Sequence, residues 1–549
     1  MPVYKTPGVY VEEISTLPPS VAEVSTAIPA FIGYTQKYTG TKPVVARVNT
    51  LLEFEDLFGG PDLAEFTVDI DADAKITKVT RKEVTGATSD APHFLMYYAV
   101  SHYFKNGGGS CYIVSVGSYG PPDNKTAVSK DDLSDGLDAL KMEDEPTLIL
   151  LTDAVSLSAA AEFHELCTSA LDQAGELKDR FVIFDVKQYG DANKSDVDTF
   201  RTGVGQNNLA YGAAYYPYLQ TSLSYIYREE DVTIRSPWSR RLTENSLTVS
   251  HATADTGSAT VVVVHDTAAT KPTFTATATT LTITIPKTAT GAAVVTEWGT
   301  WKAGNEAHGF NIIAAGDGAG TPPAGSTTLG DIGSLADIKT TRTALYNQIK
   351  ARLADERVVL PPSAAVAGIY ARVDRDRGVW KAPANVSLSA VIGPVTKLTN
   401  TQQDDLNVHS TGKSINAIRA FTGQGTLVWG ARTLLGNDNE WRYVPVRRLF
   451  NMIEESVRKS TSFAVFEPND MTTWLKVKGM IEGFLYTLWG RGALAGPTPA
   501  AAYFVNVGLG KTMTPLDILE GRMNVELGIA AVRPAEFIIL KFSHKLQEA

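Results

Sequence analysis

One short motif has the residue types of a phosphate-binding loop: STGKS, at residues 410–414. Gly412, Lys413 and Ser414 match the end of the pattern G-x-x-x-x-G-K-[ST], in which backbone amides and the lysine hold nucleotide phosphates. Asn407 stands where that pattern needs its first glycine, and the preceding residues QQDDLN do not form an apolar strand. The motif therefore lacks both the tight turn and the strand of a nucleotide site, and it predicts no phosphate site.

The other reactive residue types form no catalytic or metal-binding pattern. His164 and Glu165 are not followed by the second histidine of H-E-x-x-H, and no G-x-S-x-G elbow was found around a serine. Cys111 and Cys167 lie far apart and belong to no C-x-x-C pair, so buried, reduced thiols are expected. The sequence predicts no catalytic residue, no metal site, no cofactor, and a protein that is not an enzyme.

The composition of the 549 residues is that of a folded globular protein, with 44% hydrophobic and 20% charged residues. No stretch approaches the ~20 apolar residues that span a bilayer, and the first residues lack the layout of a signal peptide. We therefore expect assembly in the cytoplasm and no direct insertion into a membrane.

The net charge of -10 is unevenly distributed. Residues 336–549 contain 26 Lys+Arg against 19 Asp+Glu, a net of +7, and residues 1–335 contain 24 against 41, a net of -17. Such asymmetry suggests that the two parts face different partners. The basic residues are spread out with no Lys/Arg run, which argues against nucleic acid as a partner.

Apolar strands alternate with helices in the first part of the chain, as is typical of a mainly parallel sheet covered on both faces. Two later helices are well marked, one beginning at Pro445 and one capped by Asp470. The pattern in the first part predicts strands over residues 111–116, 147–151 and 181–186, and helices over residues 51–58, 133–141 and 159–174.

The composition changes between residues 242 and 300, where Thr, Ala and Val dominate. Short β-branched runs separated by Gly, Pro and Ala-Thr stretches predict an all-β insertion, which we place at residues 225–333. The fold class expected from these patterns is α+β, with an α/β domain built on a mainly parallel sheet and an inserted all-β, Thr-rich domain.

Both ends of the chain have the character of isolated strands. Near the N-terminus, prolines exclude a helix around a short run with strand propensity, and the last apolar run, at residues 537–542, predicts a late strand. An unpaired strand at each end is suited to adding to a sheet of another molecule. The residues expected to make these contacts between subunits are Val9, Tyr10, Val11, Glu12, Phe537, Ile538, Ile539 and Leu540.

Several separate segments resemble the tail sheath proteins of contractile phage tails and related contractile injection systems. The resemblance covers about residues 1–220 and 336–549, and the Thr-rich insertion departs from it. The segments that carry it are PGVYVEE (7–13), TAIPAFIGYT (26–35), PPSAAVAGIYARVDRDRGVWKAPAN (361–385), VRRLFNMIEESV (446–457), VFEPND (465–470) and GRMNVELGIAAVRPAEFIILKF (521–542).

This resemblance implies a mechanical protein with a conserved inner domain built from both chain ends. Such subunits form stacked hexameric rings in a helical tube around an inner tube, and the tube contracts from a metastable extended state to drive the inner tube through a target membrane. The implied partners are further copies of the chain, the inner tube protein, and baseplate and terminal cap proteins. The division expected is an N-terminal linking arm (1–20), an α/β sheath domain (21–224), the outward-facing insertion (225–333), an inner tube-facing domain (334–532) and a C-terminal linking strand (533–549).

Contact with an acidic inner tube is expected in the basic C-terminal part, at the helix that follows Pro445. The candidate tube-facing residues are Arg447, Arg448, Arg458 and Lys459. Pairing of these residues with acidic neighbours such as Glu454 and Glu455 is an equally good interpretation. Two other functions stay open, namely a nucleotide-using or transferase enzyme with an α/β core, and a static polymer resembling a surface layer.

Overall fold

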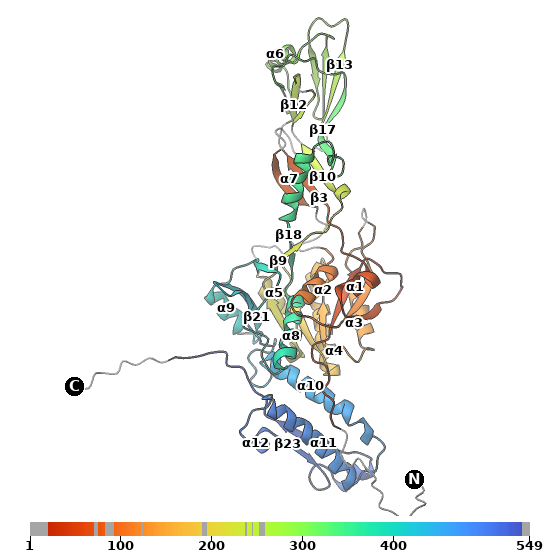
Figure 1. Ribbon diagram of the computed structural model, residues 1–549, viewed down its shortest axis with the longest axis vertical. Coiled ribbons are helices and arrows are strands. Elements are labelled where there is room, and N and C mark those ends of the chain that lie inside the picture. The colour runs from red at the N-terminus through yellow and green to blue at the C-terminus, as the bar shows by residue number, and fades with distance from the viewer. Residues whose placement is uncertain are drawn as a thin grey trace, which may run out of the picture. The chain divides into compact units, whose positions relative to one another are not determined.

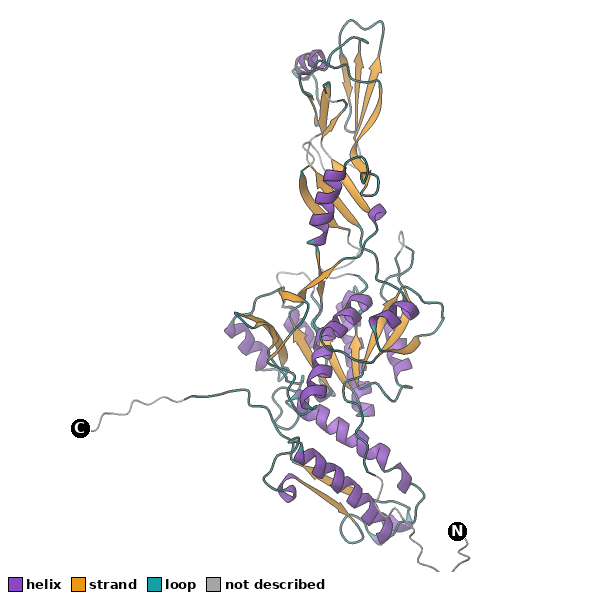
Figure 2. Ribbon diagram, in the orientation of Figure 1, coloured by secondary structure: helices purple, strands orange, loops and turns teal. Residues whose placement is uncertain are grey.

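The computed structural model describes residues 20–70, 75–82, 93–121, 125–188, 195–236, 239–243, 245–251 and 259–540 of the chain. They divide into two compact units, drawn in Figures 1 and 2. The main unit comprises residues 1–60, 88–221 and 359–549, and the insertion unit comprises residues 61–87 and 222–358.

The described residues of the main unit form a sheet of nine strands. Its six central strands are parallel, and the antiparallel strands lie at its edges, so the expected mainly parallel sheet is confirmed. In spatial order the strands are β19 (Val386–Ser387), β22 (Gly425–Val428), β21 (Ile415–Phe421), β8 (Gly212–Tyr216), β7 (Phe181–Asp185), β6 (Leu148–Leu151), β1 (Pro29–Thr35), β5 (Cys111–Ser118) and β2 (Val44–Val48).

Helices cover both faces of this sheet because alternate residues of each buried strand point to opposite sides. Phe31 of β1 belongs to the core formed with helices α2 (Met96–Lys105) and α8 (Ser363–Arg377). Its neighbour Ile32 faces α3 (Lys130–Leu140), where a Cβ on Gly136 would lie 2.8 Å from the Ile32 side chain. The helices around the sheet are α1 (Leu51–Phe58), α2 (Met96–Lys105), α3 (Lys130–Leu140), α4 (Ala160–Leu177), α5 (Asp196–Gly203), α8 (Ser363–Arg377) and α9 (Asn400–Asn407).

A second core of the main unit lies around the two long helices expected from the sequence, α10 (Val444–Ser460) and α11 (Met471–Gly490). The Asp470 side chain caps α11 by accepting hydrogen bonds from the amides of Thr472 and Thr473. The remaining elements of this region are α12 (Pro499–Ala502), α13 (Pro515–Leu519), β23 (Tyr503–Val507) and β24 (Val525–Ile529).

The insertion unit contains helices as well as strands, so the expectation of an all-β module is wrong. Helix α6 (Gly291–Lys302) is capped by Thr290 and buries Val294 and Trp298, which are four residues apart on one face. The described strands form a seven-stranded and a three-stranded sheet. They are β14 (Thr273–Ala276), β15 (Thr280–Ile285), β13 (Ala259–His265), β17 (Gly325–Ser334), β10 (Val232–Ser236), β3 (Phe66–Ile70) and β4 (Ile76–Arg81), and β11 (Ser239–Arg241), β12 (Leu247–His251) and β16 (Phe310–Ala314).

The boundaries of the insertion unit differ from the expected 225–333. Hairpin β3–β4 belongs to it because Phe66 pairs in parallel register with Val232 of β10. Helix α7 (Thr343–Ala354) also belongs to it, since Leu345 and Ile349 share a core with Phe66. The chain passes into the insertion unit twice, first for residues 61–87 and then for residues 222–358, and this second passage begins in β9 (Leu219–Ser224) and ends in β18 (Arg357–Leu360).

The expected separation of residues 21–224 from residues 334–532 is also incorrect. Strand β21 continues the sheet of the first segment by pairing in parallel with β8. Helix α8 packs against α2 and against β6 and β7. The short two-residue strand β19 and the four-residue strand β20 (Val391–Pro394) come from the same later segment. Both segments therefore build one unit.

The expectation about the two cysteines is confirmed. Cys111 and Cys167 are buried, free thiols, and burial raises the pKa of both. Among the described residues, no helix is long and apolar enough to cross a bilayer.

Asp185 at the end of β7 is a buried carboxyl group that accepts hydrogen bonds from the amide and the hydroxyl of Ser363, at 2.7 and 2.5 Å. Burial raises the pKa of Asp185 from 3.8 to about 7, although the bonds from Ser363 offset part of that rise. Because the folded state holds this proton more tightly than the unfolded state, its contribution to stability is greatest below pH 3.8 and decreases as the pH rises to about 7.

The expected loss over that window is about 4 kcal/mol, from about 1.4 kcal/mol for each pKa unit. Asp185→Asn lacks this titration, so we expect the variant to match or exceed the stability of the wild type at pH 8 and to lose its advantage at pH 4. Urea unfolding of both proteins between pH 4 and pH 8 measures the difference. Parallel pH profiles of the two proteins would contradict the prediction.

Candidate assembly interface

The lysine of the STGKS motif is engaged inside the main unit. Lys413 is 2% exposed, and its Nζ atom donates a hydrogen bond to the backbone oxygen of Arg201. The Ser414 hydroxyl donates to the backbone oxygen of Asn407 at 2.6 Å. Both polar groups thus hold the loop that precedes β21 in place.

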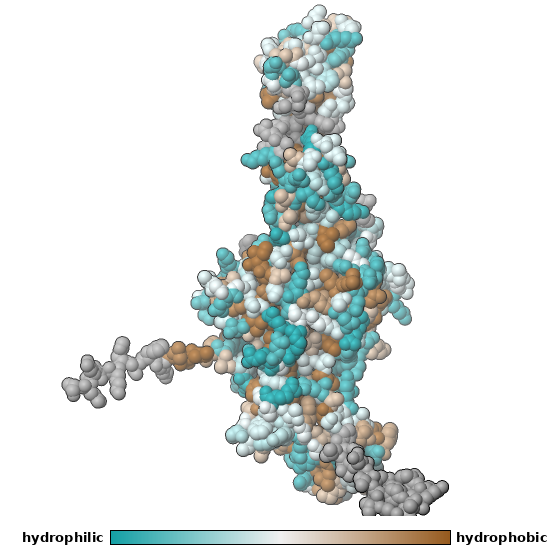
Figure 3. Space-filling model, in the orientation of Figure 1, coloured by the Kyte–Doolittle hydropathy of each residue, from teal (hydrophilic) through white to brown (hydrophobic). Residues whose placement is uncertain are grey.

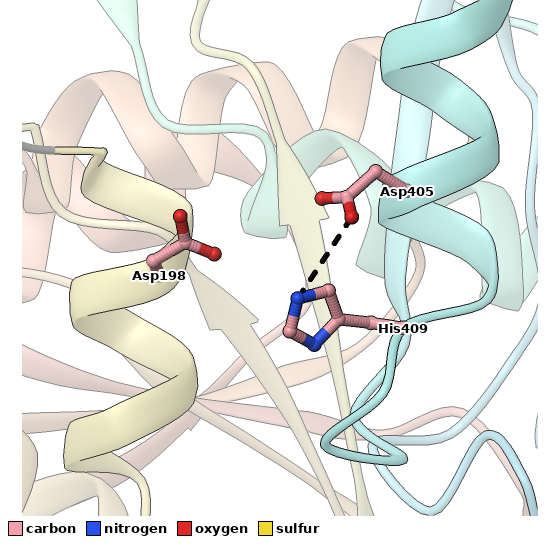
Figure 4. A group of neighbouring side chains, drawn as sticks. All are labelled: Asp198, Asp405 and His409. Carbon is pink, nitrogen blue, oxygen red and sulfur yellow. Dashed lines mark ion pairs between the residues drawn. The ribbon is translucent and has the colours of Figure 1, made fainter.

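Asp198 of α5, Asp405 of α9 and His409 bring possible metal-ligating atoms within 4.8 Å of one another (Figure 4). The buried Arg201 contacts both carboxylates, with Nη1 at 3.1 Å from Asp198 and 3.0 Å from Asp405. This guanidinium already supplies the positive charge that a metal ion would bring. We therefore interpret the group as an ion-pair network that joins α5 to α9.

Arg447, one of the candidate tube-facing residues, is buried in the main unit. Its guanidinium donates to Asn451 at 2.7 Å and to Glu454 at 2.9 Å, and it lies 4.1 Å from the centre of the Trp441 ring. The alternative interpretation, pairing with acidic neighbours within the domain, describes this residue. The expectation that Arg447 faces outward is wrong because its side chain is buried and its guanidinium bonds to groups of the same protomer.

Arg448 is also buried, which corrects the same expectation for this residue. It forms a salt bridge with the buried Asp374 of α8 at 2.5 Å and lies over the Tyr370 ring at 4.5 Å. It donates a further hydrogen bond to the backbone oxygen of Thr26 at 2.8 Å. Thr26 in turn donates from its hydroxyl to Asp374 at 2.6 Å. Arg448 therefore ties the N-terminal segment to α8 and α10.

Arg458 and Lys459, at the end of α10, stay partly exposed. Both contact Asp144 and Glu455; the Lys459 ammonium is 2.7 Å from Asp144. Hydrogen bonds from Lys459 and Arg458 hold the pKa of Asp144 below its usual value. Burial alone would raise the pKa of Glu455, but hydrogen bonds from the same two basic residues outweigh burial and keep this pKa below its usual value as well. The pairs with Asp144 are exposed and therefore weak and salt-sensitive, whereas Glu455 is buried. Of the four candidates, Arg458 and Lys459 are the two whose side chains keep exposed surface.

The N-terminal segment runs along α10 before it enters β1. The amides of Ala22 and Val24 donate to the hydroxyls of Ser460 and Ser456, at 3.2 and 3.1 Å. Glu23 forms a salt bridge with Arg491 at 2.5 Å. The segment is thus fixed from residue 22 onward, whereas Val9, Tyr10, Val11 and Glu12 lie outside the described residues.

The C-terminal segment extends away from the rest of the main unit (Figure 1), and its Glu536 forms a salt bridge with Arg432. Phe537, Ile538, Ile539 and Leu540 form no strand and are between 70% and 81% exposed. Figure 3 shows these residues as a hydrophobic stretch that projects into solvent. The late strand expected here is absent from the described protomer because the segment has no partner strand within it.

Strands β23 and β24 form a separate two-stranded antiparallel sheet against α11, with Tyr503 opposite Ile529 and Val507 opposite Val525. Within the part of the chain that is described, neither strand pairs with a third. Both outer edges therefore present main-chain donors and acceptors, and such edges readily accept another strand. Sequence reasoning missed this sheet, although the alternation VELGI at 525–529 is a weak signal for it.

Comparison with known proteins identifies the chain's relatives. The family models described as phage tail sheath protein central domain and phage tail sheath C-terminal domain match residues 278–434 and 436–545. The sheath of an extracellular contractile injection system, PVC, in the contracted state is 26% identical with a TM-score of 0.56, and the match covers 100% of this chain and 99% of the other. The contracted helical sheath of the anti-feeding prophage is 28% identical with a TM-score of 0.55, and the match covers 99% of this chain and 100% of the other.

The chain belongs to the tail sheath protein family. The resemblance seen in the sequence is thus confirmed. The expectation that residues 225–333 depart from the family is only partly right. The match to the central domain of the sheath family begins at residue 278, so it includes the later part of this region.

Curated sheath relatives match over shorter stretches. The tail sheath protein of Burkholderia phage BcepMu is 31% identical over 141 residues, which are 25% of this chain and 29% of that protein. The tail sheath protein of Enterobacteria phage T4 is 26% identical over 114 residues, which are 21% of this chain and 17% of that protein. The chain's matched part thus spans less than a third of the length of these two relatives.

Proposed function

We propose that this chain is the mechanical subunit of a contractile sheath, which polymerises into a helical tube of stacked six-membered rings around an inner tube. The observation that carries the proposal is the coexistence, in one unit, of an exposed apolar segment without a partner strand and a two-stranded sheet with open edges. The segment at residues 537–540 can add to the sheet β23–β24 of a neighbour through main-chain hydrogen bonds. The strand predicted at residues 9–12 would add at another edge.

Such a contact joins two different surfaces of identical subunits, so it can repeat from subunit to subunit, both around a ring and from one ring to the next. Each protomer donates its own terminal strands and accepts those of its neighbours. A relative solved in a six-fold symmetrised baseplate, that of the anti-feeding prophage, supports rings of six and association with a baseplate. Inner tube and cap proteins complete the proposed partners.

The proposed work cycle needs no nucleotide, in keeping with the structural family and the engaged Lys413. Extended and contracted sheaths are two packings of the same subunits, and their free-energy difference drives contraction. A bias of roughly 1–5 kcal/mol per protomer, on the scale of ordinary two-state changes, is multiplied by the number of subunits. The terminal strands keep neighbours linked while contacts between the unit surfaces exchange.

Within this proposal, Arg458 and Lys459 provide a weak electrostatic contact with an acidic tube surface. Their acidic neighbours Asp144 and Glu455 already screen them, so the contact should break easily when the sheath moves outward. The insertion unit is proposed to face away from the tube.

Negative-stain electron microscopy of the purified full-length protein tests the proposal. We expect wide hollow tubes with a regular helical repeat. A monodisperse monomer or a small closed oligomer at all concentrations would contradict it.

A further inference from the structure

Both terminal segments are fixed to the main unit by a buried arginine, and the two arginines lie close together in the sequence. Arg448 holds the N-terminal segment at Thr26 through the network with Asp374. Arg432, in the loop between β22 and α10, holds the C-terminal segment at Glu536. The second contact lies immediately before the exposed residues 537–540, so it decides where the free part of the chain begins.

The Arg432–Glu536 contact has the geometry of a firm attachment. The guanidinium donates to both carboxylate oxygens, with distances of 2.6 Å from Nη2 and 2.9 Å from Nε. Asn407 Nδ2 and the Tyr443 hydroxyl donate to the same carboxylate at 2.8 and 3.2 Å. Bidentate, charge-assisted bonds of this kind are among the strongest in proteins.

Burial and charge make this attachment hard to release. Arg432 is 3% exposed, and its Nη1 atom is occupied by the backbone oxygens of Asn407 and Gly436. Loss of Glu536 would leave a buried guanidinium without its carboxylate, which is strongly unfavourable. Burial opposes ionisation of Glu536, but the hydrogen bonds from Arg432 and Asn407 outweigh it and hold the pKa of Glu536 below its usual value.

We propose that Arg432 and Glu536 form an anchor, the C-terminal anchor, that fixes the origin of the linking segment and places its pivot directly after Glu536. The inference rests on the proposed function and adds residues that position the strand without touching the neighbour. Fixing the origin shortens the free segment, which raises the effective concentration of the strand near the neighbouring sheet. It also means that tension in a linking strand is transmitted through Glu536 to the loop before α10.

The test measures the critical concentration for tube formation by sedimentation. Glu536→Gln removes the charge but keeps the side-chain shape, and we expect the critical concentration to rise about tenfold or more. Asn407→Asp places a carboxylate beside Glu536 and offers Arg432 a substitute partner, so it should raise the critical concentration while the unassembled protomer unfolds at an unchanged temperature. Glu306→Gln, an exposed carboxylate of the insertion unit, is the control and should assemble like the wild type.

The two variants separate anchoring from general stability. A merely structural role for Glu536 predicts that assembly falls only when the unfolding temperature falls, and in that case Asn407→Asp would assemble normally. Normal assembly of Asn407→Asp, or of folded Glu536→Gln, would overturn the anchor. If the wild type itself forms no tubes, the proposed function fails, and that result is distinguishable from failure of the anchor.

Discussion

Protein truncated after Glu536 is expected to fold and to remain unassembled at concentrations where the full chain forms tubes. The deleted part contains Phe537, Ile538, Ile539 and Leu540, which are exposed in the protomer and so contribute little to its own stability. If the two side chains on one face of the added strand become buried in the assembly, each would contribute about 1.5–3 kcal/mol, or about 3–6 kcal/mol together. Even the lower figure changes an association constant by about two orders of magnitude.

Sedimentation and negative-stain microscopy measure this loss, and circular dichroism and thermal unfolding check that the truncated protein is folded. The matched control is Ile313→Ser, which removes an exposed isoleucine from the insertion unit and should leave assembly unchanged. Within the segment, successive residues of a strand face opposite sides, so Ile538→Ser and Ile539→Ser should differ in their effect on assembly. Tubes of normal appearance from the truncated protein would rule out strand donation by this segment.

Asp374→Asn is expected to destabilise the main unit by about 3–5 kcal/mol, the range found when one partner of a buried ion pair is removed. The substitution leaves Arg448 buried without a carboxylate and weakens the hydrogen bond that Asp374 accepts from Thr26. The Tyr370 ring compensates little for the lost carboxylate. Its cation–π contact with Arg448 contributes about 2 kcal/mol, but this contact is present in the wild type as well as in the variant. Urea unfolding at pH 7 measures the change in midpoint.

Asp376→Asn provides the comparison on the same helix. Asp376 is exposed and pairs with its neighbour Arg375, so its replacement should change stability by about 0.5 kcal/mol or less. Equal stability losses in the two variants would show that the Arg448–Asp374 pair does not fix the N-terminal segment.

The elements with strong local signals could be predicted from the sequence. Apolar runs predicted β5, β6 and β7, Pro445 marked the start of α10, and the capping residue Asp470 marked the start of α11. A glycine after an amphipathic run marked the end of α1, where Gly59 has a φ of 86°. Each of these signals lies within a few neighbouring residues, so it can be recognised without knowing the rest of the fold.

The features that could not be predicted depend on contacts between distant segments. Arg447 and Arg448 flank an apolar helix face, and arginine is usually exposed, so the sequence favours an outward position. The burial of Arg448 depends on Asp374, which is 74 residues away along the chain. Pairing of β3 with β10 likewise joins segments that are separated in the chain by strands β5, β6, β7 and β8 of the first sheet, and no local pattern encodes it.

The buried Arg448 and Arg432 hold the N-terminal and C-terminal segments to the main unit, and local sequence patterns do not encode these contacts. The sequence predicted two strands at the chain ends but not where each becomes free. The N-terminal segment is bound to the main unit from residue 22 onward, and Arg448 holds it again at Thr26. The C-terminal segment is bound at Glu536. We propose that the parts of the chain that link subunits lie beyond these points.

The most direct test of the account is a cryo-electron microscopy map of tubes assembled from the full-length protein, at a resolution that separates strands. We predict that the sheet β23–β24 gains a strand traceable to residues 537–540 of a neighbouring subunit, with Glu536 of that subunit still bound to its own Arg432. A map in which β23–β24 stays two-stranded, or gains a strand from its own chain, would contradict the proposal that terminal strands link the sheath.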